Sequence, residues 1–296
     1  MTKKRTQRKT VDMEKLGDVL EELDRVHGIG DLSPDPLEVV REYPNASDQE
    51  AAGLIASSLA YGNVRQIVKS VRRALEPLGE HPARTLKGVR PDKALRLARG
   101  FRHRLHNEID LARLYLAIGK ILKQHGSLDA AFASASAGDV PLRERLDAFV
   151  RLLHKAAHSK TIENRQEGKS YFDHLLPIPS RGSACKRLNL FLLWMVRPDD
   201  GIHFGIWKSL TPDQLLMPLD THVWRIGRYL GLIDRATPDW KAARQLTDRL
   251  SEINPDDPTR YDFAISRLGI HRLCQSRAAG DHCRQCALKG VCVRVD

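Results

Sequence analysis

The sequence has few aromatic residues, no long apolar run and no even spread of cysteines. Aromatic residues make up 6% of the 296 positions, which fits a helical protein better than a β-sandwich. The longest apolar stretch, Leu188–Val196, is about half as long as a bilayer span requires. The start at Met1 is basic, so no signal peptide is expected. Only Cys185 lies outside the last 23 residues, whereas a secreted disulfide framework would spread its cysteines. These absences predict a cytoplasmic protein with no membrane segment.

Positive charge is in clear excess. The chain carries 48 Lys and Arg against 37 Asp and Glu, a formal net charge of +11. Apolar residues make up 42% of the chain, so a normal core can form and wholesale disorder is excluded. The excess favours a polyanionic partner, nucleic acid first. Residues 1–10 contain five basic residues and no acidic one. This composition predicts a solvated, disordered tail or, alternatively, a segment that binds phosphates weakly and non-specifically.

Helical periodicity dominates, and no alternating strand pattern of any length is present. Ser47 resembles a helix N-cap because Glu50 follows it three residues later. Between two helical regions, residues 171–183 form a turn rich in proline and serine. An all-α fold is therefore predicted, with helices over residues 11–26, 51–59, 64–75, 95–104, 109–124, 142–158 and 188–196, another opening at Asp220, and the last two over 240–253 and 260–273.

The four C-terminal cysteines follow the spacing Cys-x8-Cys-x2-Cys-x5-Cys: Cys274, Cys283, Cys286 and Cys292. Four thiolates on one short loop can enclose a single centre, which predicts a [4Fe–4S] cluster or, alternatively, a zinc ion. Zinc stays open because His271 and His282 are also available as ligands. Without a metal, these residues would be reduced, buried thiols. Basic residues near the loop either contact phosphates or offset thiolate charge: Arg277, Arg284, Lys289 and Arg294.

The segment Leu219–Ile226 resembles the catalytic segment of the helix-hairpin-helix (HhH-GPD) DNA glycosylases of the endonuclease III type. In that family an aspartate followed by Thr-His heads a helix, and a four-cysteine loop follows about fifty residues later. Asp220 and Cys274 are 54 residues apart here. Two weaker matches are residues 54–63, like the early helix and DNA-wedge loop, and residues 176–183, like the hairpin. The second departs from the pattern because Gly182 alone remains of the hairpin glycines. The chain would form a divergent bacterial branch.

The resemblance implies base-excision DNA repair, in which a damaged base is flipped out and its N-glycosidic bond is cut. Asp220 would stabilise the cationic transition state, although a plain helix N-cap is its alternative role. Lys186 would be the nucleophile for an added AP-lyase activity, but the alignment puts Ser183 closer to that position. The implied DNA-binding residues are Tyr61, Asn63, Ser180, Arg181, Gly182, Ser183, Arg187, His222 and Arg225. The cysteine loop would hold a [4Fe–4S] cluster with a structural task.

The predicted architecture has two lobes and a basic tail at residues 1–10. Residues 11–48 and 215–296 would form one domain, which includes the cysteine loop, and residues 49–214 a helical barrel with the hairpin. The expected partner is double-stranded DNA with a damaged base, bound by a monomer associated with the nucleoid. The alternative function is a non-catalytic nucleic-acid-binding iron–sulfur or zinc protein, and a weaker one is a zinc ribbon that binds a protein.

Overall fold

The structure is a computed structural model that describes residues 11–26, 32–136, 138, 140–275 and 283–293. The predicted basic tail at residues 1–10 lies outside the described residues. The all-α class is confirmed, because the described part of the chain holds fifteen α-helices and a single pair of two-residue strands. The chain divides into a central unit, Ile29–Leu215, and a terminal unit made of Met1–Gly28 and Leu216–Asp296. Residues 32–48 thus fall in the central unit.

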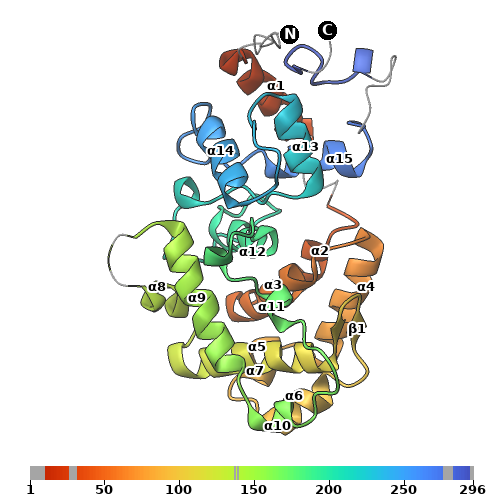
Figure 1. Ribbon diagram of the computed structural model, residues 1–296, viewed down its shortest axis with the longest axis vertical. Coiled ribbons are helices and arrows are strands. Elements are labelled where there is room, and N and C mark those ends of the chain that lie inside the picture. The colour runs from red at the N-terminus through yellow and green to blue at the C-terminus, as the bar shows by residue number, and fades with distance from the viewer. Residues whose placement is uncertain (1–10, 27–31, 137, 139, 276–282, 294–296) are drawn as a thin grey trace, which may run out of the picture. The chain divides into compact units, whose positions relative to one another are not determined.

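The central unit holds most of the helices and the strand pair (Figure 1). Its first part contains α2 (Pro36–Val40), α3 (Ala46–Leu59), α4 (Val64–Leu75), the 3-10 turn η2 (Glu76–Leu78), α5 (Pro82–Leu86), α6 (Pro91–Leu97), β1 (Arg102–His103) and β2 (His106–Asn107). Its second part contains α7 (Glu108–His125), α8 (Leu128–Ala135), α9 (Leu142–Ala157), α10 (Lys160–Glu163), α11 (Phe172–Leu175), η3 (Pro179–Arg181), α12 (Lys186–Val196) and η4 (Pro212–Gln214).

Helix α7 is the core element of the central unit. Asn107 caps its start, where the Asn107 side chain accepts the Asp110 N–H and the Asp110 carboxylate accepts the Asn107 N–H. Its apolar residues are buried against α5, α6, α8 and α9, and each large one contributes about 1.5–3 kcal/mol. The approach to α5 is close, since a Cβ on Gly119 would lie 2.1 Å from the Leu86 carbonyl oxygen. Gly126, with φ of +85°, ends the helix.

Helices α3 and α12 pack directly against each other in the same unit. The middle of α3 consists of small residues, and a Cβ on Gly53 would lie 2.7 Å from Cε of Met195. The sequence predicts α12 as a helix that is apolar all round, and nine of its eleven residues are buried. This packing holds the N-terminus of α12 beside the C-terminal end of α3, where several candidate functional residues lie.

The terminal unit contains α1 (Met13–Val26), α13 (Thr221–Tyr229), α14 (Trp240–Ser251) and α15 (Asp262–Ile270). Leu16, Leu20 and Leu23 of the predicted apolar stripe of α1 are buried, and the C-terminal half of α1 makes polar contacts with the residues just before α15. Tyr261 Oη donates to Glu21 Oε1 at 2.6 Å, and Arg260 Nε lies 2.9 Å from Asp24 Oδ2. Helices α13 and α15 approach closely because Gly269 has no side chain: a Cβ there would lie 2.4 Å from Cβ of His222.

Two local predictions were wrong. The helix expected over 95–104 is α6, which ends at Leu97, because Gly100 at φ +70° turns the chain into β1. The strand pair that follows, with Arg102 opposite Asn107, is too short to show any alternation. Asn45, not Ser47, occupies the N-cap position of α3, and Asn45 Nδ2 donates to Asp48.

Within the described residues, no helix combines the length and the apolar character that crossing a membrane requires.

Candidate functional site

Asp220, the predicted catalytic residue, is the N-cap of α13 in the terminal unit. Its Oδ1 accepts the Val223 N–H at 2.7 Å, which satisfies one of the free donors at the start of the helix. Its Oδ2 accepts no hydrogen bond from any residue that the structure describes. The side chain is half-buried. The capping role is therefore present, and one oxygen is left to face another group.

His222 and Arg225 lie on α13, one turn apart, and connect this helix to the cysteine loop. Arg225 Nη2 donates to the Cys274 carbonyl oxygen at 2.7 Å and lies 3.4 Å from His222 Nδ1. Arg225 Nε is buried and has no hydrogen-bond partner among the described residues. His222 packs on the bare backbone of Gly269 in α15. Both side chains are half-buried, and their observed contacts hold α13, α15 and the start of the loop together.

The four clustered cysteines all have free, half-buried thiols. Burial raises the pKa of Cys274, and the nearby thiolates of Cys286 and Cys292 raise it further, while Arg225 opposes them. Cys274 is therefore within electrostatic reach of both Cys286 and Cys292. In the described ranges, no three His, Cys, Asp or Glu side chains already have the arrangement of a metal site. His282, Arg277 and Arg294 lie outside the described residues, and His271 is exposed.

The proline–serine turn belongs to the central unit, and most of its donors have internal partners. Ser180 N–H donates to Asp147 Oδ1 at 2.8 Å, and Arg181 pairs with Asp173 at 2.9 Å. Gly182 has the positive φ of +91° that the predicted hairpin requires, but its N–H donates to the Pro179 carbonyl. Ser183 Oγ accepts the N–H of Cys185, which is buried as expected. An approaching anion would therefore meet side chains before free backbone N–H groups.

Lys186 and Arg187 begin α12, and both reach back to the end of α3. Lys186 Nζ donates to the Ala60 carbonyl at 3.2 Å. Arg187 is buried, and its guanidinium donates to the Ser58 carbonyl at 2.7 Å and to the His174 carbonyl. Burial lowers the pKa of Arg187 to about 10. Lys186 and Asp220 lie in different units.

Tyr61 is the centre of a cluster that the sequence did not predict. Its ring makes edge-to-face contacts with three histidines, His103, His106 and His174, at centroid distances of 4.8, 5.7 and 5.2 Å. The guanidinium of Arg187 lies over the ring at 4.9 Å, and Tyr61 Oη donates to the His103 carbonyl. His103 and His106 lie on the two short strands, and only their His-x-x-His spacing hints at the cluster. These contacts fix the residue that the resemblance placed in a DNA wedge.

Asp110 holds the histidine cluster in place through a hydrogen bond with His106. It is fully buried and accepts hydrogen bonds from His106, Asn107, Ser170 and Tyr171. Burial alone would raise the Asp110 pKa, but the hydrogen bonds from His106 and Ser170 lower it overall. Burial also lowers the pKa of His174 to about 4, and the charge of Arg187 adds to this effect. His174 is therefore neutral at physiological pH.

Helix α4 begins directly after Tyr61-Gly62-Asn63, with the bounds that the sequence predicted. Asn63 is its N-cap, and the Asn63 side chain accepts the N–H groups of Arg65 and Gln66. The exposed face of the helix is basic and carries Arg65, Lys69, Arg72 and Arg73. Arg72 pairs with Glu42, and Arg73 donates to the Gly100 carbonyl. The side chains of Arg65 and Lys69 have no hydrogen-bond or ion-pair partner in the described chain.

Comparison with known families identifies the chain. A family model described as a protein of unknown function (DUF2400) matches residues 35–271, well over half of the sequence. The chain belongs to the DUF2400 family. The span that matches DUF2400 includes Tyr61, Lys186 and Asp220 and ends before Cys274. No curated protein and no solved structure matches the chain.

The predicted membership of the HhH-GPD DNA glycosylases is therefore wrong. The family found is DUF2400, and no match to the helix-hairpin-helix family accompanies it. The motif that carried the resemblance is short. An aspartate cap followed by an amphipathic helix, as at Asp220 and α13, is a general solution to starting a helix. Such a pattern arises in unrelated families.

Proposed function

We propose that this DUF2400 protein binds nucleic acid, with double-stranded DNA as its ligand. The observation that carries the proposal is the exposed basic face of α4. Arg65, Lys69, Arg72 and Arg73 share that face, whereas Ile67 and Val71 on the opposite face are buried. A row of cations on one rigid helix can neutralise successive phosphates and release their counterions. The overall charge of +11 supports the same conclusion.

The alternative is that the basic face of α4 has no ligand and only keeps the protein soluble. Two details favour binding. Arg65 and Lys69 have no acidic partner among the described residues, although Arg72 on the same face pairs with Glu42. The N-terminus of α4 follows Gly62, whose φ of +107° brings the chain sharply into the helix beside Tyr61. The free cations therefore lie next to the rigid Tyr61 cluster, on a scaffold that pre-orders them.

The test is a binding measurement with a charge-neutralised double variant, Arg65→Gln with Lys69→Gln. We expect the wild-type chain to bind duplex DNA with an affinity that falls steeply as salt rises. The double variant should lower the magnitude of the slope of log K against log salt by about 0.9 for each lost phosphate contact. A matched control is Lys155→Gln with Lys160→Gln, which removes the same charge from α9 and α10. Equal losses in both variants would show that only net charge matters, against a role for α4. Preference for RNA over DNA would overturn the assignment of the ligand.

The cysteine loop is proposed to hold a metal centre, a [4Fe–4S] cluster or alternatively zinc. The support is the Cys-x8-Cys-x2-Cys-x5-Cys spacing, the electrostatic effect of Cys286 and Cys292 on Cys274, and the soft thiolate donors, which suit both metals. With four protein thiolates no open coordination position would remain, so the task would be to fold the loop. Metal analysis of the purified protein distinguishes the cases. A brown protein with bound iron and sulfide indicates the cluster, and a colourless one with bound zinc indicates the alternative.

A second candidate function is excision of a damaged base by Asp220. The observation that favours it is the Asp220 Oδ2 atom, which has no partner among the described residues while Oδ1 caps α13. A carboxylate oxygen aimed at a deoxyribose would stabilise the positive charge that develops as the glycosidic bond breaks. Lys186 is the proposed nucleophile for strand cleavage, although its amine donates to the Ala60 carbonyl.

Excision can be separated from helix capping because asparagine caps a helix about as well as aspartate. Asp220→Asn should keep the stability of the terminal unit, and Asp220→Ala should lower it by about 1 kcal/mol. Duplexes that contain oxidised, deaminated or alkylated bases would be incubated with all three proteins, with borohydride present to trap a Schiff base. Loss of base release in Asp220→Asn supports excision. If the wild type binds the duplexes but releases no damaged base, the excision proposal fails and the DNA-binding proposal stands.

A further inference from the structure

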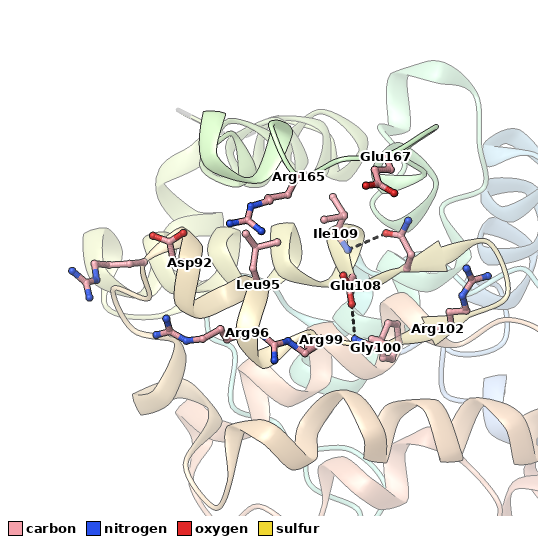
Figure 2. Close-up of a pocket in the computed structure, with 13 residues that line it drawn as sticks. Asp92, Leu95, Arg96, Arg99, Gly100, Arg102, Glu108, Ile109, Arg165 and Glu167 are labelled. Carbon is pink, nitrogen blue, oxygen red and sulfur yellow. Dashed lines mark hydrogen bonds between the residues drawn. The ribbon is translucent and has the colours of Figure 1, made fainter.

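A cavity of about 930 Å³ opens in the central unit, and none of its described lining residues is a candidate site residue from the sequence. Figure 2 shows that its lining side chains come from α6 and the turn after it, from the strand pair, from the start of α7 and from the loop after α10. Five of the lining residues are arginines: Arg90, Arg96, Arg99, Arg102 and Arg165. Four of them lie close together in sequence, within residues 90–102, and the fold brings Arg165 to them.

The five arginines are exposed, and their side chains have no hydrogen-bond or ion-pair partner in the described part of the protein. Other surface arginines of the chain do have partners, such as Arg235 with Asp239 at 2.6 Å and Arg72 with Glu42 at 2.5 Å. Three acids also line the cavity, which leaves an excess of two positive charges. One of these acids, Glu108, is already engaged, because its carboxylate accepts the Gly100 N–H at 2.5 Å. The cavity therefore concentrates unneutralised positive charge in a concave space.

The walls of the cavity are held in place by internal contacts. Gly100 is fixed on both sides, since Arg73 donates to its carbonyl and its own N–H donates to Glu108. The strand pair, with Arg102 opposite Asn107, leads directly into the capped start of α7. A rigid frame thus carries flexible guanidinium groups, and less ordering is needed when a ligand arrives.

We propose that this cavity binds the phosphate groups of a nucleic-acid strand. Arginine stays charged at any physiological pH and presents paired donors that match two phosphate oxygens. Phe101, the only aromatic residue among the described residues of the lining, is buried, so these residues offer no platform for stacking bases. Recognition would therefore be of the backbone and independent of sequence.

This proposal rests on the proposed function and extends it from α4 to a second contact. Arg73, on the basic face of α4, donates to the Gly100 carbonyl at the rim of the cavity. The basic face of α4 and the arginine cavity are thus adjacent parts of one unit. A nucleic-acid strand that contacts Arg65 and Lys69 on α4 can therefore continue past Arg73 and Gly100 to the cavity.

The test compares a triple variant of the cavity, Arg96→Gln, Arg99→Gln and Arg102→Gln, with a control triple variant of equal charge change. The control is Arg84→Gln, Lys87→Gln and Lys123→Gln, whose side chains are exposed and outside the lining. All six positions are on the surface, so melting temperatures should stay close to that of the wild type. Binding of a short duplex is measured by fluorescence anisotropy over a range of salt concentrations.

We expect the cavity variant to bind about 10- to 100-fold more weakly at 0.1 M salt, with a slope smaller in magnitude by about 2–3. The control variant should lose much less. Equal behaviour of the two triple variants would overturn the inference. If the cavity variant binds like the control while Arg65→Gln with Lys69→Gln loses affinity, the inference fails and the proposed function stands. If the wild type does not bind the duplex at low salt, both the cavity inference and the proposed function are contradicted.

A free nucleoside polyphosphate also presents phosphate groups to the arginines. A separate experiment distinguishes it from a nucleic-acid strand. ATP is titrated against the wild type and the cavity variant at constant ionic strength, with and without DNA. Competition between ATP and DNA that the cavity mutations abolish supports a shared phosphate site. ATP binding that the mutations abolish while DNA affinity is unchanged would assign the cavity to a nucleotide and overturn the strand proposal.

Discussion

Replacing Asp110 by asparagine tests whether the histidine cluster depends on one buried carboxylate. The two carboxylate oxygens each accept two donors. Oδ1 accepts Ser170 Oγ at 2.8 Å and Tyr171 N at 3.1 Å, and Oδ2 accepts Asn107 N at 3.3 Å with His106 Nδ1 at 3.4 Å. An amide must put an NH₂ group where one oxygen was, so one pair of donors loses its acceptor.

The less costly orientation places the new NH₂ group on the Oδ2 side. There His106 can change tautomer and accept a hydrogen bond, but the Asn107 N–H is left without a partner. One buried, unsatisfied N–H costs about 1–3 kcal/mol, and the loss of charge at the remaining bonds adds about 1 kcal/mol. We therefore expect Asp110→Asn to destabilise the central unit by about 2–4 kcal/mol. For a unit of this size that is about 4–16 °C in melting temperature.

Differential scanning calorimetry at neutral pH measures this effect. The control is Asp213→Asn, an exposed position in η4, which should stay within about 0.5 kcal/mol of the wild type. Acid should narrow the gap between Asp110→Asn and the wild type. The lowered pKa of Asp110 makes its contribution full above the unfolded pKa near 3.9, and the contribution disappears as pH falls through the folded pKa. An Asp110→Asn protein that melts with the wild type at pH 7 refutes this description of the cluster.

Two further predictions concern the packing of the candidate residues. The pKa of His174 lies at about 4 in the folded protein against 6.5 unfolded, so stability should fall as pH drops from about 6.5 to about 4. Because the ring is partly exposed, the loss should be about 1–2 kcal/mol, and His174→Asn should remove it in pH-dependent unfolding. Gly269→Ala should destabilise the terminal unit by about 1–3 kcal/mol in urea titrations, since the added Cβ would meet His222 at 2.4 Å. The same substitution should cost less when it is combined with His222→Gly, which removes the contacting Cβ, and an equal cost in both backgrounds would contradict the contact.

Local chemistry made much of the helical fold predictable. Helix α4 has the predicted bounds, and Asp220 caps α13, because helical periodicity and capping depend on neighbours in sequence. The end of α6 was missed because Gly100 was not recognised as a turn residue in a left-handed conformation. The N-cap of α3 was misassigned because Ser47 and Asn45 are both residue types that suit this position. The position of Asp48, which accepts the Ala83 N–H, depends on a contact between residues 35 positions apart and is not visible in the sequence.

The sites depend on contacts that sequence spacing does not encode. Tyr61 meets His174 across more than a hundred positions, and Arg96 and Arg165 share a cavity for the same reason. The cysteine spacing was visible directly because the four cysteines are close together in the sequence, and the metal centre that it indicates stays a prediction. The family assignment failed because an eight-residue helix start is compatible with many folds, whereas the DUF2400 match extends over residues 35–271.

The most direct test of the central claim is the salt dependence of duplex DNA binding by the purified 296-residue protein. With a short duplex of random sequence, the dissociation constant should rise by a factor of about 10³ or more between 50 and 200 mM salt if six phosphates are contacted. Neutralising Arg65 and Lys69 should flatten this dependence. A protein that fails to bind DNA at 50 mM salt, or binds with an affinity indifferent to salt, contradicts the claim that its basic surface serves nucleic-acid binding.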